Sequence, residues 1–132
     1  MTDYKVSSYS MEASDFEAIF EGIMRNSKDG LFITDHQGAV VMVNRATEKM
    51  VDFDVSKILG KNVREIVAAG YYDKSVALEV LRKRQPVSMI QVSRNGKRIL
   101  ATGIPIFGDC GNIRFVLVND RDITSLENRT HW

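Results

Sequence analysis

Cysteine and histidine, which most often carry metal and redox chemistry, are scarce in this sequence. It contains one cysteine, Cys110, and two histidines, His36 and His131. A single cysteine forms no internal disulfide, and no leader with charged, apolar and small-residue parts opens the sequence, so the expected compartment is the cytoplasm. No group of His, Cys, Asp or Glu has metal-ligand spacing, and the sequence has no nucleophile motif or phosphate-binding glycine loop. We therefore expect neither a metal site nor a catalytic site.

Long apolar runs and an excess of one charge are also absent. No apolar stretch approaches the roughly 20 residues that a membrane-spanning helix needs. The 18 Lys and Arg residues nearly balance the 17 Asp and Glu residues, which leaves a formal charge of +1. This balance gives no electrostatic footprint for nucleic acid or an anionic membrane, so neither is an expected partner. The 132 residues suffice for one domain with one hydrophobic core.

The amino-terminal part divides into an aperiodic segment and an amphipathic one. Residues 1–13 are expected to be a flexible lead-in, and residues 14–27 to form a helix. Ser14 and Glu17 have the spacing of a capping box. An apolar stripe at helical spacing consists of Phe16, Ile19, Phe20 and Ile23. The stripe either closes the domain's own core or meets a second copy, and the period alone does not decide between them.

The remaining residues alternate between strand and helix patterns. Strands are expected at 31–35, 39–43, 87–93, 97–107 and 113–120, small helices within 45–83, and a longer helix over 73–83. Asn44 stands where the first of these helices would start and is expected to cap it. Asn95-Gly96 predicts a tight hairpin turn with positive φ at both central residues. The order predicts an α+β fold, a five-stranded antiparallel sheet covered on one side by helices inserted between the second and third strands.

Four turn motifs in this order carry a resemblance to a known family. They are Asp35-x-x-Gly38, Asn44, Asn95-Gly96 and Arg121-Asp122-Ile123-Thr124. Over roughly residues 14–126 the chain resembles the PAS family, which implies a PAS sensor domain at 14–124. In that family the Asp-Ile-Thr segment starts the linker to the output domain, so the resemblance implies signal coupling by Asp122, Ile123 and Thr124 and a connector at 125–132. The alternative is a solvated turn without a coupling role.

A narrower resemblance comes from three further segments. Gly60-Lys61-Asn62, Gly70-Tyr71-Tyr72 and Pro86-Val87-Ser88 look like the amino-terminal PAS domains of sigma-54-dependent transcriptional activators. The implied parent protein is a bacterial regulator. Its ATP-hydrolysing AAA+ domain and helix-turn-helix domain are not contained in these residues.

Two cofactors of PAS domains are disfavoured. Blue-light flavin domains have a Gly-x-Asn-Cys-Arg stretch, but here Val63 replaces the cysteine and cannot form the adduct. Haem-binding relatives supply an axial histidine from the helix before the third strand, and residues 73–83 contain none. His36, His131 and Cys110 are interpreted as solvated bystanders.

A small organic metabolite remains as a candidate ligand of the interior. Strand alternation puts Met89 and Gln91 on one face, and by resemblance this face is the inner one, with Gln91 at the place of a ligand-contacting asparagine. Ala101 replaces a second such asparagine, and Asp120 stands where flavin-binding relatives carry a glutamine. A buried Asp120 would need a donor from a ligand, a water, Arg98 or Arg114. The full candidate pocket is Met50, Phe53, Ile66, Val76, Val80, Met89, Gln91, Ala101, Val118 and Asp120. The alternative is a packed, ligand-free interior.

The opposite sheet face predicts a homodimer. It offers the apolar residues Ile90, Val92, Leu100, Phe115 and Leu117. This surface is too apolar to stay in water, and the helix at 14–27, from the same chain or a partner, is the nearest cover. The candidate interface is Phe16, Ile19, Phe20, Ile23, Phe115 and Leu117. We expect a sensing and dimerisation module. A constitutive dimerisation module stays open, and a small enzyme is remote because it has no reactive constellation to use.

Overall fold

A computed structural model describes residues 4–6, 10–51 and 54–125 of the chain. The elements are α1 (Ala13–Asn26), β1 (Gly30–Asp35), β2 (Val40–Val43), α2 (Arg45–Met50), the 3-10 helix η1 (Val55–Lys57), α3 (Val63–Ala68), α4 (Val76–Lys83), β3 (Val87–Val92), β4 (Arg98–Phe107) and β5 (Ile113–Asp122). The predicted order of helices and strands is confirmed.

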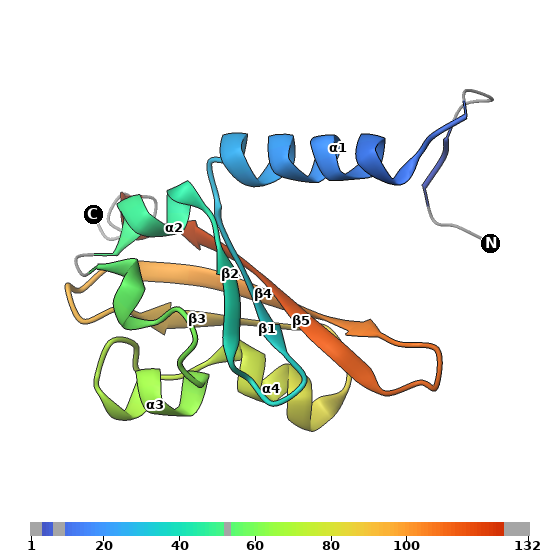
Figure 1. Cartoon of the computed structure of the whole chain (residues 1–132). Helices are drawn as coiled ribbons and strands as arrows, with labels where there is room; N and C mark the ends of the chain where they lie inside the picture. Colours follow the sequence, from blue (N-terminus) through green and yellow to red (C-terminus); the bar gives the residue numbers. More distant parts are fainter. Residues whose placement is uncertain (1–3, 7–9, 52–53, 126–132) are drawn as a thin grey trace.

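The five strands form one antiparallel sheet with the order β2-β1-β5-β4-β3. Figure 1 shows α3 and α4 on one side of this sheet and α1 on the other. The predicted α+β fold with helices inserted between β2 and β3 is therefore confirmed. Because β1 lies beside β5, Gly30 is paired with Asp120. The segment that enters β1 from α1 and the end of β5 thus meet at one end of the sheet.

Two predicted helix starts are wrong because of local and long-range hydrogen bonds. α1 begins at Ala13, and Glu12, not Ser14, is its N-cap residue. The carboxylate of Asp15 accepts a 2.9 Å hydrogen bond from the Glu12 backbone N–H. α4 begins at Val76 rather than Asp73, because Asp73 is bound to β3. Its backbone N–H donates to the Val92 carbonyl at 3.1 Å, and its carboxylate accepts from the Val92 N–H at 2.8 Å.

The hairpin between β3 and β4 also differs from the prediction in one detail. Gly96 has φ 83°, but Asn95 does not have positive φ. The Gly96 N–H donates to the Ser93 carbonyl at 2.8 Å, and the Ser93 N–H donates to the Lys97 carbonyl at 2.9 Å. This is a longer turn in which one left-handed glycine closes the loop, so only the glycine position needs conformational freedom.

The hydrophobic core lies between the inner face of the sheet and the inserted helices. Its buried residues are Val40, Ile58, Val63, Ile66, Val76, Ala77, Val80, Ala101, Ile113, Val116 and Val118. α4 approaches β4 closely at Gly103, where a Cβ atom would lie only 2.7 Å from Cγ2 of Val80. The glycine therefore permits tight helix-on-sheet packing on the inner face.

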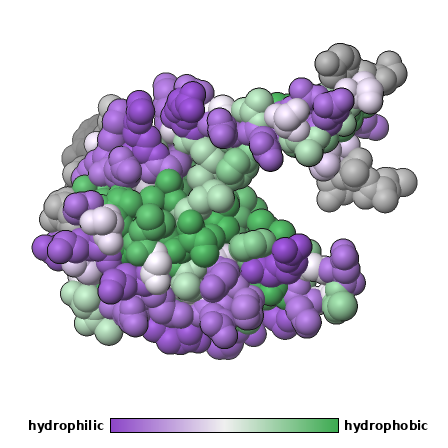
Figure 2. All heavy atoms as spheres, in the orientation of Figure 1, coloured by the Kyte–Doolittle hydropathy of each residue, from purple (hydrophilic) through white to green (hydrophobic). Residues whose placement is uncertain are grey.

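α1 does not take part in this core. None of its residues is buried, and it projects from the body of the domain (Figure 1). The apolar stripe predicted from the sequence is exposed: Phe16 45%, Ile19 50%, Phe20 41% and Ile23 56%. The interpretation that α1 closes its own domain's core is therefore wrong. Figure 2 shows a hollow below α1, with hydrophobic side chains gathered on the side of the sheet.

Candidate functional site

Among the described residues, the interior cavity found beside the predicted ligand site is small. Its volume is about 20 Å³, and its wall includes Phe32, Val40, Thr47, Ile66, Tyr72 and Gln91. A space of this size holds about one water molecule, whereas sites for organic ligands start at about 300 Å³. The interior of this structure is thus close to fully packed.

Gln91 lies on the inner face of β3 and is 4% exposed. Its Oε1 atom accepts a 2.9 Å hydrogen bond from the backbone N–H of Val76, the first residue of α4. Helix starts leave such N–H groups without a partner inside the helix. In this structure Gln91 therefore joins β3 to α4, a structural role that strand alternation did not reveal.

Replacing Gln91 by leucine is expected to destabilise the domain by about 1–3 kcal/mol, because the buried Val76 N–H loses its acceptor. Urea denaturation of the purified domain measures this loss. Ser88→Ala, on the exposed face of the same strand, is the matched control and should change the free energy of unfolding by less than about 0.5 kcal/mol. Equal stability of the Gln91 variant and the wild type would contradict the structural role.

The other candidate pocket residues do not form one cavity. Ile66 lines the small cavity, but Met50 lines an open groove on the surface, so its predicted place in the interior is wrong. α2, which carries Met50, makes its main contacts with β1 and α1. Phe53 lies outside the described residues. The remaining members pack within or against the core: Val76, Val80, Met89, Ala101 and Val118.

Asp120 is the most unusual polar residue of the interior. It lies on the inner face of β5 between Gly30 and Ala101, and it is 3% exposed. Among the described residues, its Oδ1 atom has no hydrogen-bond partner. Of the two predicted donors, Arg114 places its guanidinium over the Phe115 ring, 5.5 Å from the ring centre. Burial, with a smaller contribution from the charge of Asp29, raises the pKa of Asp120 to about 7.

Asp29, in the segment between α1 and β1, makes contacts with β5 that the sequence analysis did not predict. Its carboxylate accepts hydrogen bonds from Asn119 Nδ2 at 3.1 Å and from Arg121 at 3.1 and 3.3 Å. The hydrogen bond from Arg121 holds the pKa of Asp29 below its usual value. The Arg121 side chain is 64% exposed, so the ion pair contributes little to the free energy of unfolding. Its main effect is to hold the segment before β1 against the end of β5.

Asn44 anchors the same region from the other side, and its predicted capping role is confirmed. Its Oδ1 atom accepts from the N–H groups of Thr47 at 3.1 Å and Leu31 at 2.8 Å. Its Nδ2 atom donates to the Asp29 carbonyl at 3.1 Å. Hydrogen bonds of Asn44 and Asp29 thus connect the segment before β1 both to α2 and to the end of β5.

The predicted coupling segment is fixed to the start of β4. Asp122 accepts from the Thr124 N–H at 3.0 Å. Thr124 Oγ1 accepts from the Arg98 N–H at 2.9 Å, and the Ile123 N–H donates to the Arg98 carbonyl at 2.9 Å. Strand β5 runs to Asp122, two residues beyond the predicted end. Residues 126–132 of the predicted connector lie outside the described part, and the coupling role stays a prediction.

The apolar outer face of the sheet includes more residues than the sequence analysis predicted. Phe115 and Leu117 lie on the outer face of β5, where they pair with Ile106 and Ile104 of β4. Ile33 of β1 flanks Leu117 on the other side. Ile104 is 41% exposed and Ile106 is 40% exposed. The same strand alternation that indicated Leu100 could have identified Ile104 and Ile106.

Other kinds of site are not found in the part of the chain that the structure describes. Residues 4–6, 10–51 and 54–125 contain no group of His, Cys, Asp and Glu that could hold a metal ion. Over the same residues, no helix is both long and apolar enough to cross a membrane.

Together, the fold and the packed interior define a small α+β module with an antiparallel sheet and helices packed on its inner face. The sequence model of the PAS fold matches residues 16–124, and the chain belongs to the PAS family. PAS domains are generally sensory modules without catalytic activity. No curated protein matches the sequence closely enough to count as a relative.

Similar solved structures show the same fold. An RNA-binding light-oxygen-voltage receptor has a TM-score of 0.71 and 15% identity, over 98% of this chain, which spans only 39% of that receptor. The PAS domain of a Colwellia psychrerythraea protein has a TM-score of 0.62 and 17% identity, over 84% of this chain and 99% of that one. A sensory box sensor histidine kinase from Vibrio cholerae has a TM-score of 0.57 and 22% identity, over 85% and 94%.

Proposed function

We propose that this chain is the signal-sensing and dimerisation PAS module of a cytoplasmic bacterial transcriptional regulator. The observation that carries the proposal is the pair of exposed apolar surfaces, the stripe of α1 and the outer face of the sheet. Large apolar patches on a domain surface mark places where another protein binds. The sigma-54 context rests on the resemblance of segments 60–62, 70–72 and 86–88 to activators of that class.

The proposed partner is a second copy of the chain. α1 leaves its own sheet face uncovered (Figure 2), so a partner copy can place its stripe there while offering an equivalent surface in return. Such a self-complementary contact is the rule in two-fold symmetric dimers. α1 leads into β1 at the end of the sheet where β5 ends, because Gly30 is paired with Asp120. A change in dimer arrangement would therefore act directly on Asp122, Ile123 and Thr124.

Sedimentation equilibrium of the purified chain at micromolar concentration tests the dimer. We expect a mass of two chains, with dissociation only on dilution. A monomer at every concentration up to about 100 μM, where an interface with a dissociation constant of 1 μM would be largely occupied, would overturn this part of the proposal.

The ligand of the proposed sensor is a small metabolite that enters by displacing core side chains near Gln91 and Asp120. The Asp120 oxygen without a hydrogen-bond partner supports a ligand, since a donor on the ligand would remove the free-energy cost of burying this polar atom unpaired. The 20 Å³ cavity favours the second candidate, a constitutive dimerisation module with a packed interior.

A thermal-shift screen of metabolites separates the two candidates. A ligand at 100 times its dissociation constant is expected to stabilise the folded domain by about 2.7 kcal/mol. Mass spectrometry of the natively purified chain supplies an independent readout of a retained molecule. A screen without hits and a preparation without a retained molecule would assign the constitutive module instead.

A further inference from the structure

Several positively charged side chains converge on one surface groove, away from the interior cavity. The groove has a volume of about 460 Å³ and lies where the end of α1, α2 and the ends of β4 and β5 meet. Five cationic side chains line it, from four separate segments: Arg25, Lys28, Arg45, Lys49 and Lys97. Among the described residues that line it, Asp122 is the carboxylate. In Figure 2 hydrophilic side chains cover α2 and the adjoining end of α1.

One of the five cations has a partner among the described residues. Lys97 is paired with Asp122 at 3.6 Å. Within the described residues, no salt bridge or side-chain hydrogen bond engages Arg25, Lys28, Arg45 or Lys49. The carboxyl end of α1 carries a partial negative charge, which accounts for one or two cations beside it. It does not explain Arg45 and Lys49, which come from another helix and face the same concavity.

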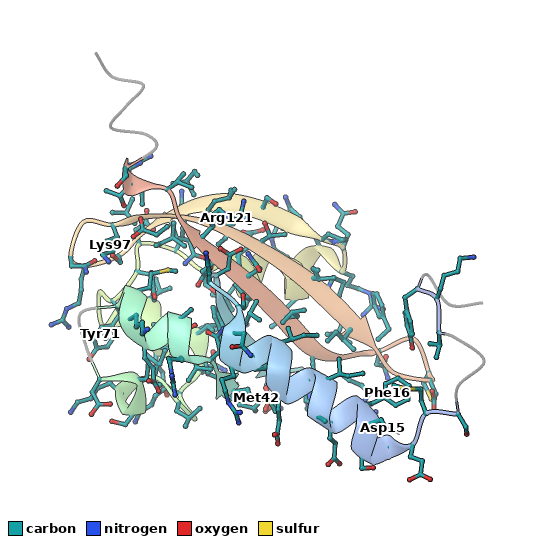
Figure 3. The ribbon with its side chains drawn as sticks, turned by 90° about the horizontal axis from the view of Figure 1, so that it is seen from above. Asp15, Phe16, Met42, Tyr71, Lys97 and Arg121 are labelled. Atoms are coloured by element: carbon teal, nitrogen blue, oxygen red, sulfur yellow. The ribbon has the colours of Figure 1, made fainter. Side chains whose placement is uncertain are left out.

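The charge is also concentrated relative to the whole chain. The chain has a formal charge of only +1, yet unpaired positive groups repel one another in this groove. In Figure 3 the labelled Lys97 and Arg121 lie at the same end of the molecule as α2. Nucleic-acid surfaces usually carry their charge along a stripe, whereas these side chains converge on one concavity. The groove volume lies within the range of small-molecule sites.

We propose that this groove binds a small polyanion, such as a molecule that carries a diphosphate group. Arg25 and Lys28 hold the anion from the α1 side, and Arg45 and Lys49 hold it from α2. Because the main contacts of α1 in this structure are with α2, a bound anion ties α1 more firmly to the body. The site itself is independent of the interior ligand. Its effect on dimerisation, by fixing the angle of the apolar stripe, rests on the proposed function.

Isothermal titration calorimetry of the whole chain with inorganic pyrophosphate in 150 mM NaCl tests the site. We expect saturable binding of one pyrophosphate per chain. The double variant Arg45→Glu/Lys49→Glu should weaken it at least tenfold. The control Lys57→Glu/Lys61→Glu makes the same charge change on exposed side chains outside the groove and should stay within twofold of the wild type. Circular dichroism verifies folding, and Arg45→Gln/Lys49→Gln replaces the first variant if that one does not fold.

Several results would overturn the proposal. One is the absence of saturable binding up to 1 mM pyrophosphate, and another is an equal loss in both double variants, which would indicate unspecific attraction. Binding of polyglutamate, or of vesicles with anionic phospholipid, without binding of pyrophosphate would reassign the groove to an acidic protein segment or a membrane. Because calorimetry detects binding in a monomer as well as a dimer, these results are distinct from failure of the dimer. If pyrophosphate binds, sedimentation with and without it then measures the effect on dimerisation.

Discussion

Asp120→Asn is expected to stabilise the domain by several kcal/mol at pH 8 and to change its stability little at pH 4. The folded-state pKa of Asp120 is raised by burial from 3.8 to about 7. Below pH 4 the carboxyl group is protonated in both the folded and the unfolded chain, so it costs nothing extra. As the pH rises from 4 to 7, the unfolded chain gains stability by losing this proton while the folded chain retains it. The wild type therefore loses stability across this window, and the loss is complete above pH 7.

The full effect corresponds to about 4 kcal/mol, since each pKa unit equals about 1.4 kcal/mol. Asparagine keeps the shape of the side chain but never ionises, so the variant should not show this loss. Urea denaturation at half-unit steps between pH 4 and pH 8 measures the difference between the two curves.

Asp109→Asn, at an exposed position of the β4–β5 turn, is the control. Its free energy of unfolding should follow the same pH dependence as that of the wild type. The carboxyl group of Asp29 has a lowered pKa, so its contribution to stability is lost only below about pH 4 and does not overlap this window. A constant difference between wild type and Asp120→Asn from pH 4 to pH 8 would show that Asp120 finds a charged partner in solution.

The fold was predictable because its main signals are local. Alternation along residues 87–92 put Met89 and Gln91 on one face, the family resemblance implied that this face is the inner one, and turn glycines such as Gly96 gave the strand boundaries. The start of α4 was not predictable, because Asp73 is bound to Val92, which lies 19 residues away in the sequence. A hydrogen bond across that separation leaves no mark in a window of local periodicity.

The candidate site was less predictable because its contacts join residues that are far apart in the sequence. The Asp29–Arg121 pair joins residues 92 apart in the sequence, and only the order of strands brings them together. The cationic groove draws on four segments, each of which contributes only one or two of its cations. The position of Met50 was wrong because an apolar residue on a six-residue helix has no period long enough to show which side faces the core.

Ile19→Glu/Ile23→Glu is expected to weaken dimerisation at least 100-fold without unfolding the domain. Both side chains are about half exposed on α1, which buries no residue in the single chain, so the fold does not depend on them. Burial of each isoleucine in a dimer would contribute about 1.5–3 kcal/mol, and the loss of both corresponds to a factor of 100 or more in the dissociation constant. Sedimentation equilibrium measures the constant, and circular dichroism measures the fold.

Ser14→Glu/Ala18→Glu is the matched control, because it adds the same two charges to the opposite face of α1 and should leave the dimer intact. Ile104→Glu, on the outer face of β4, then shows whether helix and sheet belong to one interface. If they do, each variant weakens the dimer, since a charge in either surface must be buried without a partner. A dimer through paired α1 helices alone would leave Ile104→Glu at the wild-type constant, and the outer sheet face would then need a different partner. If Ile19→Glu/Ile23→Glu dimerised like the wild type, α1 would lie outside the interface.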